Sequence, residues 1–195
     1  MPLSREHKAQ TRARIIETAA RLFREHGYEG VGIKALMSAA GLTNGAFYAH
    51  FDSKQDLLEA VLDVPLEFTA QLRKAEDRGA SREALHYYLD PEHFELIARD
   101  CTLATLLGDA ARSDAAGQEQ LAAHVEELCA TIERQIAAEQ PKRSAAARRA
   151  LALEVLQLCI ANISLGRALG NIPLTTELAA AARGAIDRRL DAPDP

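Results

Sequence analysis

The sequence predicts an all-α fold, with an N-terminal head of three helices followed by a larger C-terminal helical body. Apolar residues recur at three- and four-residue steps along most of the chain, and no alternating segment is long enough for a β-strand. Within residues 27–57, glycines, alanines and aromatic residues have the spacing of a compact helix-turn-helix. The length of 195 residues suffices for a small head and a body with a substantial core.

The first helix of this motif is predicted from Ile33, Leu36, Met37 and Ala40, which lie on one face at helical spacing. Gly41 follows the last of them and is expected to end the helix, because glycine adopts a left-handed conformation without a β-carbon penalty. The small alanines beside this glycine let two helices approach closely. The pattern therefore predicts a tight turn after residue 40.

Thr43 is a good N-cap for a second helix, which is expected from about Asn44 to His50. The inward-facing residues are expected to be Ala46, Phe47 and Phe51, and the outward-facing ones Asn44, Gly45, Tyr48, Ala49 and His50. Ser53 is expected to cap a third helix, which places Lys54 in its first turn. The helix-turn-helix is thus predicted over about residues 32–51.

The outward-facing residues have the chemistry of a DNA contact. Asn44 can donate to and accept from a base edge, Gly45 lets the backbone approach a phosphate, and Tyr48 and His50 can donate to phosphate oxygens. Lys54 can join the exposed N–H groups of its helix N-terminus against a phosphate. Base discrimination is expected mainly from Thr43, Asn44 and the methyl group of Ala49.

Simpler interpretations stay open for three of these residues. Tyr48 is also compatible with a surface aromatic residue that has no partner. His50 can merely complement the dipole at the end of a short helix. Lys34, on an exposed helix face, needs no function at all.

The motif resembles the DNA-binding domain of the TetR family of bacterial ligand-responsive repressors. The residues that match the family pattern are Phe23, Gly27, Tyr28, Gly45, Phe47, Tyr48, His50, Phe51, Lys54 and Leu57. The resemblance covers about the first third of the chain and implies a set of DNA contacts. This set is Lys34, Thr43, Asn44, Gly45, Tyr48, Ala49, His50 and Lys54. Val31 and Gly32 occupy the two positions before the first helix of the motif, where the family often has Thr or Ser. A contact between a hydroxyl group and a DNA phosphate is therefore not implied at these positions.

The net charge of −5 is unusual for a DNA-binding protein, but the charge is unevenly distributed. Residues 1–24 contain six Lys or Arg and two Glu, a local balance of +4. Arg5, Lys8, Arg12 and Arg14 can therefore meet phosphates beside the motif or enter a minor groove. The alternative is a solvated N-terminus without a partner.

The body is predicted to be helical throughout. The helix that begins at Lys54 is expected to kink or break at Pro65, and residues 78–81 read as a turn with a new N-cap. A further helix is expected from Pro91, and a long amphipathic helix over about residues 121–140. This long helix has the clearest periodicity in the body.

The last two helices predict self-association. Residues 144–170 are apolar on both faces, which indicates a helix with two partners, and Thr176 can cap a final helix. By resemblance to the family, these two helices pair with their copies across a two-fold axis in a homodimer. The interface residues are then Leu153, Leu156, Ile160, Leu178, Ala182, Ala185 and Ile186. The alternative is that both helices only complete a monomeric core.

The resemblance also implies a small-molecule effector bound among the body helices. The candidate ligand-binding residues combine apolar surface with a few polar groups, as small-molecule pockets do. They are Phe68, Leu72, Tyr87, Tyr88, Phe94, Cys101, Leu106, Cys129 and Asn162. Each of them alone is more often plain core, and for the leucine and phenylalanine residues that interpretation is favoured. Cys101 near a helix start suggests a second possibility, a thiol that senses oxidants or electrophiles, although free cysteine is commonly an inert buried residue.

Other classes of protein fit the sequence less well. We expect a cytoplasmic chain without a membrane span, because no run of about 18 apolar residues and no signal-peptide core occurs. The three cysteines lie far apart and predict reduced thiols without a metal site, and we expect neither a cofactor nor enzymatic activity.

The sequence therefore predicts a sequence-specific transcriptional regulator, most simply a homodimeric repressor that leaves a pseudo-palindromic operator when an effector binds. The DNA-binding domain is expected over residues 1–53, the ligand-binding and dimerisation domain over 54–190, and a disordered tail over 191–195. The rival interpretation is a protein-interaction module whose helix-turn-helix has lost its DNA role.

Overall fold

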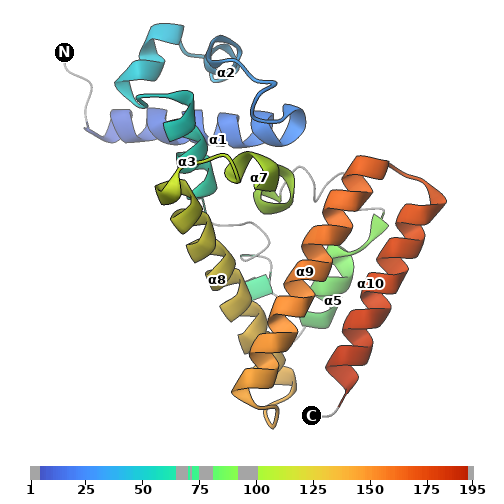
Figure 1. Ribbon diagram of the computed structural model, residues 1–195. Helices are drawn as coiled ribbons and strands as arrows, with labels where there is room; N and C mark the ends of the chain where they lie inside the picture. Colours follow the sequence, from blue (N-terminus) through green and yellow to red (C-terminus); the bar gives the residue numbers. More distant parts are fainter. Residues whose placement is uncertain (1–4, 65–69, 71, 75–80, 92–100, 193–195) are drawn as a thin grey trace. The chain divides into compact units, whose positions relative to one another are not determined.

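The computed structural model describes residues 5–64, 70, 72–74, 81–91 and 101–192, and the regular structure in these ranges is helical (Figure 1). This confirms the predicted all-α class. The elements are α1 (Arg5–His26), α2 (Ile33–Ala39), the 3-10 helix η1 (Asn44–Ala49), α3 (Lys54–Leu62), α5 (Ser81–Tyr88), α7 (Thr102–Ala110), α8 (Ala115–Glu139), α9 (Ala145–Leu169) and α10 (Pro173–Asp191). Pro65, Phe68, Phe94, the predicted turn before Ser81 and the last three residues of the predicted tail lie outside the described residues.

The chain forms two compact units. The N-terminal unit comprises residues 1–64 with 105–121, and the C-terminal unit comprises residues 65–104 with 122–195. The N-terminal unit is therefore larger than the head expected from the sequence, because α3 and a later segment pack into it. The functional boundary at residue 53 stays a prediction.

The core of the N-terminal unit is built from the apolar stripes of its helices. Its fully or nearly fully buried residues include Ile15, Ala19, Phe23, Leu36, Met37, Phe47, Phe51, Leu57, Leu58, Val61 and Leu106. Burying a side chain as large as leucine or phenylalanine contributes about 1.5–3 kcal/mol relative to leaving it exposed. The inward orientation predicted for α2 and for the two phenylalanines is confirmed.

The turns that shape the helix-turn-helix follow the predicted chemistry. Gly41 ends α2 with a φ of 68°, in the left-handed region, as expected for a glycine stop. Ser53 caps α3, and its hydroxyl accepts a hydrogen bond of 3.0 Å from the Asp56 backbone N–H. These two positions fix where the neighbouring helices end and begin.

The second helix of the motif differs from the prediction in type. Residues Asn44–Ala49 form a 3-10 helix, with i to i+3 bonds from Ala46 N–H to the Thr43 carbonyl and from His50 N–H to the Phe47 carbonyl. Thr43 occupies the N-cap position, but its side chain makes no capping bond. In a segment this short, few α-helical hydrogen bonds offset the entropy cost of forming the first turn. The tighter 3-10 helix is therefore little less stable than an α-helix here.

In the C-terminal unit, α9 and α10 run side by side (Figure 1). Ser144 caps α9, and Gly170 ends it with a φ of 73°. The predicted cap at Thr176 is wrong, because α10 begins earlier, at Pro173. Proline is favoured at the first helical position, where its missing N–H is not needed, and the Thr175 hydroxyl accepts from the Ile172 N–H at 3.0 Å.

Helix α9 is the most apolar long helix of the described chain. By length and composition it could cross a membrane, but 44% of its most apolar window is buried inside the protein. Its buried residues are Leu151, Ala152, Val155, Leu156, Cys159, Asn162, Ile163 and Gly166. Arg149 near its start forms ion pairs with Glu126 and Glu133 of α8 at 2.6 and 2.9 Å. These contacts are those of a core helix within a helical unit.

Candidate functional site

The outer surface of the helix-turn-helix comes from α2 and η1. Thr43, Asn44, Gly45, Tyr48 and Ala49 are all exposed, as the sequence predicts for residues that face a groove. The Tyr48 side chain is 63% exposed, and its ring meets the fully buried Phe47 ring edge-on, with centroids 5.2 Å apart. The buried ring below thus anchors an otherwise solvent-facing aromatic residue. Lys34 on α2 is exposed as well.

His50 lies at the end of η1 and is half-buried. Burial lowers the pKa of its imidazole, and the nearby cations Lys8 and Arg12 lower this pKa further. Its Nδ1 atom is buried and finds no hydrogen-bond partner among the described residues. An imidazole with a lowered pKa, whose Nδ1 has no partner among the described residues, therefore lies at one edge of the outer surface.

The structure adds Arg12 to this edge. Its guanidinium lies 4.7 Å from the centre of the Phe51 ring, in a cation–π arrangement beside His50. The sequence allows a phosphate contact for the basic N-terminal residues, but Arg12 is absent from the predicted site. The signal that could have found it is the spacing of Arg5, Lys8 and Arg12, which places all three on one face of α1.

Lys54 has a role that the sequence did not predict. Its ammonium group donates a hydrogen bond of 2.6 Å to the backbone carbonyl of Tyr28 and lies 4.0 Å from the centre of the Tyr28 ring. The side chain is half-buried and ties the start of α3 to the turn after α1. Contact with a phosphate stays a prediction for the N–H donors that Tyr28 does not use.

A buried polar cluster lies in the C-terminal unit and contains three of the residues predicted to bind an effector. The Tyr88 hydroxyl donates to Cys101 Sγ at 2.8 Å, and the Ala104 backbone N–H donates to the same sulfur at 3.4 Å. Burial raises the pKa of the Tyr88 phenol well above its ordinary value, and the neighbouring Cys101 raises it further. Cys101 therefore lies directly before α7, with two donors directed at its sulfur.

Helix α9 supplies the other side of this polar cluster. Asn162 is 4% exposed, and its Nδ2 donates a long hydrogen bond of 3.5 Å to the backbone carbonyl of Leu89, the residue after Tyr88. Its Oδ1 is buried and finds no partner among the described residues. Cys159, one turn earlier on α9, is fully buried, and burial raises the pKa of its thiol. We call Tyr88, Cys101, Cys159 and Asn162 the polar cluster.

The other predicted effector residues are not all near the polar cluster. Leu106 is fully buried in the core of the N-terminal unit, and its role in effector binding stays a prediction. Leu72 and Cys129 are fully buried in the C-terminal unit, whereas Tyr87 is 46% exposed. Phe68 and Phe94 lie outside the described residues.

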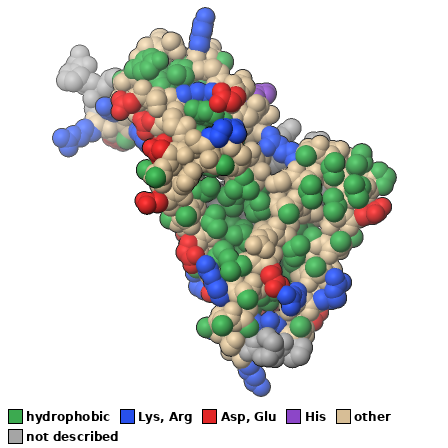
Figure 2. Space-filling view, viewed as in Figure 1, with side chains coloured by type: hydrophobic (Ala, Val, Ile, Leu, Met, Phe, Trp, Pro, Cys, Tyr) green, Lys and Arg blue, Asp and Glu red, His purple; other side chains and the backbone are tan. Residues whose placement is uncertain are grey.

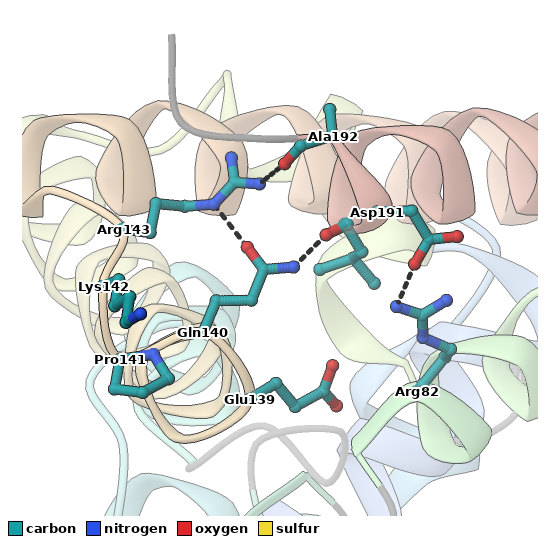
Figure 3. A pocket seen from close by; sticks show the side chains of 9 residues that line it. Arg82, Glu139, Gln140, Pro141, Lys142, Arg143, Asp191 and Ala192 are labelled. Carbon is teal, nitrogen blue, oxygen red and sulfur yellow. Dashed lines mark hydrogen bonds and ion pairs between the residues drawn. The ribbon is translucent and has the colours of Figure 1, made fainter.

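An open pocket lies where the ends of α8 and α10 meet (Figure 3). Its polar groups bind one another: Arg143 donates to the carbonyls of Arg189 and Ala192 at 3.1 and 2.6 Å, and Gln140 donates to the carbonyl of Leu190. These bonds satisfy carbonyl groups at the C-terminal end of α10, which have no partner within the helix. None of the predicted effector residues lines this pocket, and Arg143 and Gln140 in it cap the end of α10.

The predicted dimer residues fall into two groups. Leu156, Ala182 and Ile186 are buried within the C-terminal unit, and their contact with a second copy stays a prediction. The small residues of α10 allow it to pack closely on α9, and this packing covers them. Leu153 is 39% exposed, and Ile160, Leu178 and Ala185 are half-buried, so these four remain available.

Further large apolar side chains, which the sequence analysis missed, are exposed on the same two helices. They are Leu165, Leu169, Ile172 and Leu174, each between 40% and 47% exposed. Figure 2 shows hydrophobic side chains gathered over the neighbouring ends of α9 and α10. We call the set of Leu153, Leu165, Leu169, Ile172 and Leu174 the apolar face. The signal that could have found them is their helical spacing along α9 and the following turn. This spacing differs from that of the residues that α9 buries within its own unit.

Residues 15–61 match the family model described as bacterial regulatory proteins, tetR family. The transcriptional regulator TtgR of Pseudomonas putida is 36% identical over 74 residues, which cover 38% of this chain and 35% of that protein. The repressor AcnR of Corynebacterium glutamicum is 34% identical over 89 residues, covering 45% and 46%. The repressor Rv1474c of Mycobacterium tuberculosis is 30% identical over 106 residues, covering 54% and 55%. The chain thus aligns with about a third to about half the length of these relatives.

Solved structures show that the whole fold is shared. A TetR transcriptional regulator from Legionella pneumophila superposes with a TM-score of 0.72 at 19% identity, covering 96% of this chain and 98% of that one. The regulator FadR from Bacillus subtilis, solved in complex with stearoyl-CoA, superposes with a TM-score of 0.67 at 16% identity, covering 92% and 97%.

Proposed function

We propose that this chain is a member of the tetR family of bacterial regulatory proteins, because residues 15–61 match the model of that family. We propose further that it is a sequence-specific DNA-binding transcriptional regulator, most simply a repressor. The observation that carries this proposal is the exposed surface of η1, where Asn44, Gly45 and Tyr48 face solvent above a buried Phe47. A short segment held rigidly over a core can present its side chains to a major groove in one fixed orientation. A bacterial regulator of this kind acts in the cytoplasm.

The residues divide into two roles on DNA. Asn44, with Thr43 and the Ala49 methyl group, contacts base edges and supplies selectivity. Gly45, Tyr48, His50 and the exposed Lys34 meet phosphates, which fix register without distinguishing bases. Lys54 mainly holds α3 against Tyr28 and so positions the surface.

The working form is a homodimer joined through the apolar face of α9 and α10. One recognition segment makes few base contacts, whereas a two-fold dimer places two segments on a pseudo-palindromic operator. Leu165, Leu169, Ile172 and Leu174 of the apolar face support this proposal, because exposed apolar side chains that gather on one surface commonly mark an interaction site. Leu153, Ile160, Leu178 and Ala185 keep their predicted interface role.

A small-molecule effector binds in the C-terminal unit, at the polar cluster. The unsatisfied Oδ1 of Asn162 supports this site, because a buried acceptor without a partner is costly unless a ligand completes it. FadR from Bacillus subtilis was solved with stearoyl-CoA, so one structural neighbour holds a small molecule. Release from DNA requires only that the effector prefer the DNA-incompetent state, and a tenfold preference shifts the equilibrium by about 1.4 kcal/mol.

Thiol sensing through Cys101 is the second candidate for the signal. The donors Tyr88 hydroxyl and Ala104 N–H, together with the start of α7, favour a thiolate at this position. An electron-poor alkene would then form a C–S bond at one alkene carbon as its π bond breaks, and the other carbon would take a proton from solvent, which balances the proton that the thiol releases. Alkylation of Cys101 followed by measurement of operator affinity tests this candidate, which fails if complete modification leaves the affinity unchanged.

The test of the DNA-binding proposal is selection of duplexes from a random pool by the full-length protein, followed by affinity measurements against salt. We expect one pseudo-palindromic consensus, with an affinity that falls steeply as salt rises because counterions are released. Asn44→Ala should relax selectivity at particular base pairs, while Lys34→Ala should weaken all duplexes alike. A protein-interaction module would select no consensus and show no such salt dependence.

A further inference from the structure

A small internal cavity lies among α5, α8 and α10 in the C-terminal unit. Its apolar lining comes from all three helices, with Leu85 of α5, Ile132 and Ile136 of α8, and Leu190 of α10. These four side chains are at most 3% exposed. Counted as the space open to the centre of a water molecule, the cavity measures about 10 Å³, which is room for one group of that size. None of the four residues of the polar cluster lines this cavity, so it is separate from the proposed effector site.

Gln135 of α8 brings a buried amide to the wall of this cavity. Its side chain is 2% exposed, and its Nε2 donates a hydrogen bond of 2.6 Å to the backbone carbonyl of Leu72. Because a carbonyl can only accept, this bond fixes which end of the amide is the nitrogen. Leu72 does not line the cavity, so the oxygen is the polar atom that remains for it. This Oε1 is buried and finds no hydrogen-bond partner among the described residues.

The cavity adjoins the open pocket at the ends of α8 and α10, because Glu139 and Leu190 line both spaces (Figure 3). By the same measure the open pocket has a volume of about 620 Å³, and Pro141 and Ala192 add apolar surface to it. A molecule whose terminal group enters the cavity therefore has room for its remaining atoms in the open pocket.

The polar atoms of the cavity select the chemistry of its occupant. Gln135 Oε1 can only accept, and the Glu139 carboxylate at the mouth is likewise an acceptor when it is ionised, so the occupant must bring a donor. A buried water commonly makes two to four hydrogen bonds, which the four apolar lining side chains do not offer. An ammonium group would have to leave water for an apolar cavity, which costs more than one bond to a neutral amide returns. A neutral donor on an apolar body fits best.

We propose that this cavity is a second binding site, for a small neutral molecule with a terminal hydroxyl or N–H group on an apolar body. The terminal group donates a hydrogen bond to Gln135 Oε1, and the body extends past Leu190 into the open pocket. The bond satisfies an acceptor that is costly to bury alone. The ligand contacts α5, α8 and α10 together, so its binding stabilises the C-terminal unit. This site goes beyond the proposed function and does not depend on DNA binding.

The experiment is an NMR titration of the full-length protein with 2-propanol and, separately, with acetone. The two probes share a carbon skeleton, but only 2-propanol carries a hydroxyl donor. The reporters are the methyl groups of Ile132 and Ile136 in the cavity wall, and Ile163, which is fully buried in α9 and does not line the cavity, is the internal control. We expect 2-propanol to shift both reporters saturably and to leave Ile163 unchanged. Acetone should bind at least about fivefold more weakly, because it leaves the Oε1 acceptor without a partner.

Gln135→Met and Gln120→Met form a matched pair. Both replace a glutamine of α8 by an unbranched apolar side chain, but Gln120 is exposed and does not line the cavity. Gln135→Met should remove the preference for 2-propanol over acetone, while Gln120→Met should keep it. Asn162→Val, which changes the polar cluster, should keep the preference as well. Should Gln135→Met fail to fold, the comparison of the two probes on the wild-type protein still decides the matter.

Three results would overturn this site. The first is an equal response of the two isoleucine reporters to 2-propanol and acetone, or no saturation with either probe. The second is loss of the response in a folded Asn162→Val protein, which would move the alcohol to the polar cluster. The third is a bound water that shows nuclear Overhauser effects to the Gln135 amide protons and that 2-propanol does not displace, which would make the cavity a hydration site. Each result leaves the selection of DNA duplexes untouched, so the proposed regulator is tested separately.

Discussion

Lys54 Nζ donates a hydrogen bond of 2.6 Å to the backbone carbonyl of Tyr28, and the same ammonium group lies 4.0 Å from the centre of the Tyr28 ring. The two residues are 26 positions apart and belong to the start of α3 and the turn after α1. A hydrogen bond from a charged donor to a carbonyl is stronger than one between neutral groups, and the cation–π contact with the Tyr28 ring adds to it. The lysine therefore helps to hold the helix-turn-helix together from outside its own span.

Replacing Lys54 by methionine should destabilise the N-terminal unit. The change removes a hydrogen bond to a charged group, worth about 1.5–3 kcal/mol, while it keeps most of the apolar stem. Urea unfolding monitored by circular dichroism measures the loss. Lys34→Met, at an exposed site on α2, is the matched control and should change stability by less than about 0.5 kcal/mol. Full stability with weakened DNA binding would instead support the phosphate contact predicted from the sequence.

Gly41→Ala should lower the free energy of unfolding by about 1 kcal/mol. Nothing lies within 4 Å of an added Cβ, so the cost comes from the φ of 68°, which disfavours residues with a Cβ. Gly45→Ala is the comparison, because its added Cβ also meets nothing within 4 Å and its φ is not in the left-handed region. We expect thermal unfolding to leave Gly45→Ala unchanged, while its DNA affinity falls. Equal stability losses in both variants would contradict this assignment.

The helix-turn-helix could be predicted from the sequence because its signals are local. The spacing of Leu36 and Met37, the glycine stop at Gly41 and the serine cap at Ser53 each act within a few residues of the structure that they specify. The structure confirms each of them. The 3-10 winding of η1 was missed, since the apolar spacing of so short a segment does not distinguish the two helix types.

The contacts that were missed join residues far apart in the chain. Lys54 with Tyr28 and Arg12 with Phe51 depend on how α1 packs, which no local pattern specifies. Leu106 was assigned to an effector site on the basis of its apolar character, although the core that contains it lies in the other unit. Leu156 was assigned to a dimer surface because both faces of α9 are apolar, and periodicity alone does not tell which face the same chain covers.

Leu165→Glu should produce a monomer of nearly unchanged stability. Leu165 is 43% exposed on the apolar face, so a carboxylate there disrupts association without entering the core. Sedimentation velocity measures the change in oligomeric state. Leu156→Ala, at a side chain only 7% exposed on the same helix, should instead cost about 2–5 kcal/mol of stability and leave association intact at temperatures where it is folded. A Leu165→Glu dimer would locate the interface elsewhere.

The stability of the protein should fall as the pH rises above about 9, in part because of the polar cluster. Burial raises the pKa of the Cys159 thiol above its ordinary 9.0 and that of the Tyr88 phenol above its ordinary 10.0. The unfolded chain then loses these protons while the folded chain keeps them, so rising pH favours unfolding, by up to about 1.4 kcal/mol per pH unit for each group. Urea unfolding at several alkaline pH values measures this slope.

Tyr88→Phe supplies the control for this pH dependence. It should reduce the slope above about pH 10, because the phenol whose pKa is raised in the folded protein is then absent. The comparison uses slopes because Tyr88→Phe also removes the hydrogen bond to Cys101 and so changes stability at every pH. Identical slopes in the wild type and in Tyr88→Phe would contradict a raised pKa of Tyr88.

Asn162→Val should raise the free energy of unfolding by about 1 kcal/mol and abolish the response to an effector. The Oδ1 of Asn162 is buried without a partner among the described residues, and an unsatisfied buried acceptor costs about 1–3 kcal/mol. Its Nδ2 makes only the 3.5 Å bond to the Leu89 carbonyl, so little is lost on replacement. Thermal unfolding without ligand measures the gain. A residue that weakens the fold is retained where function requires it, as at a binding site.

Asn162→Asp distinguishes this explanation from a simple packing effect. It keeps the shape of the side chain but brings an ionisable carboxyl into a buried site, so it should lower stability near neutral pH. The two substitutions are thus expected to change stability in opposite directions. If Asn162→Val also destabilises the protein by more than about 1 kcal/mol, the amide supports the fold through a bond of ordinary strength, and its oxygen is no longer a reason to place the effector there.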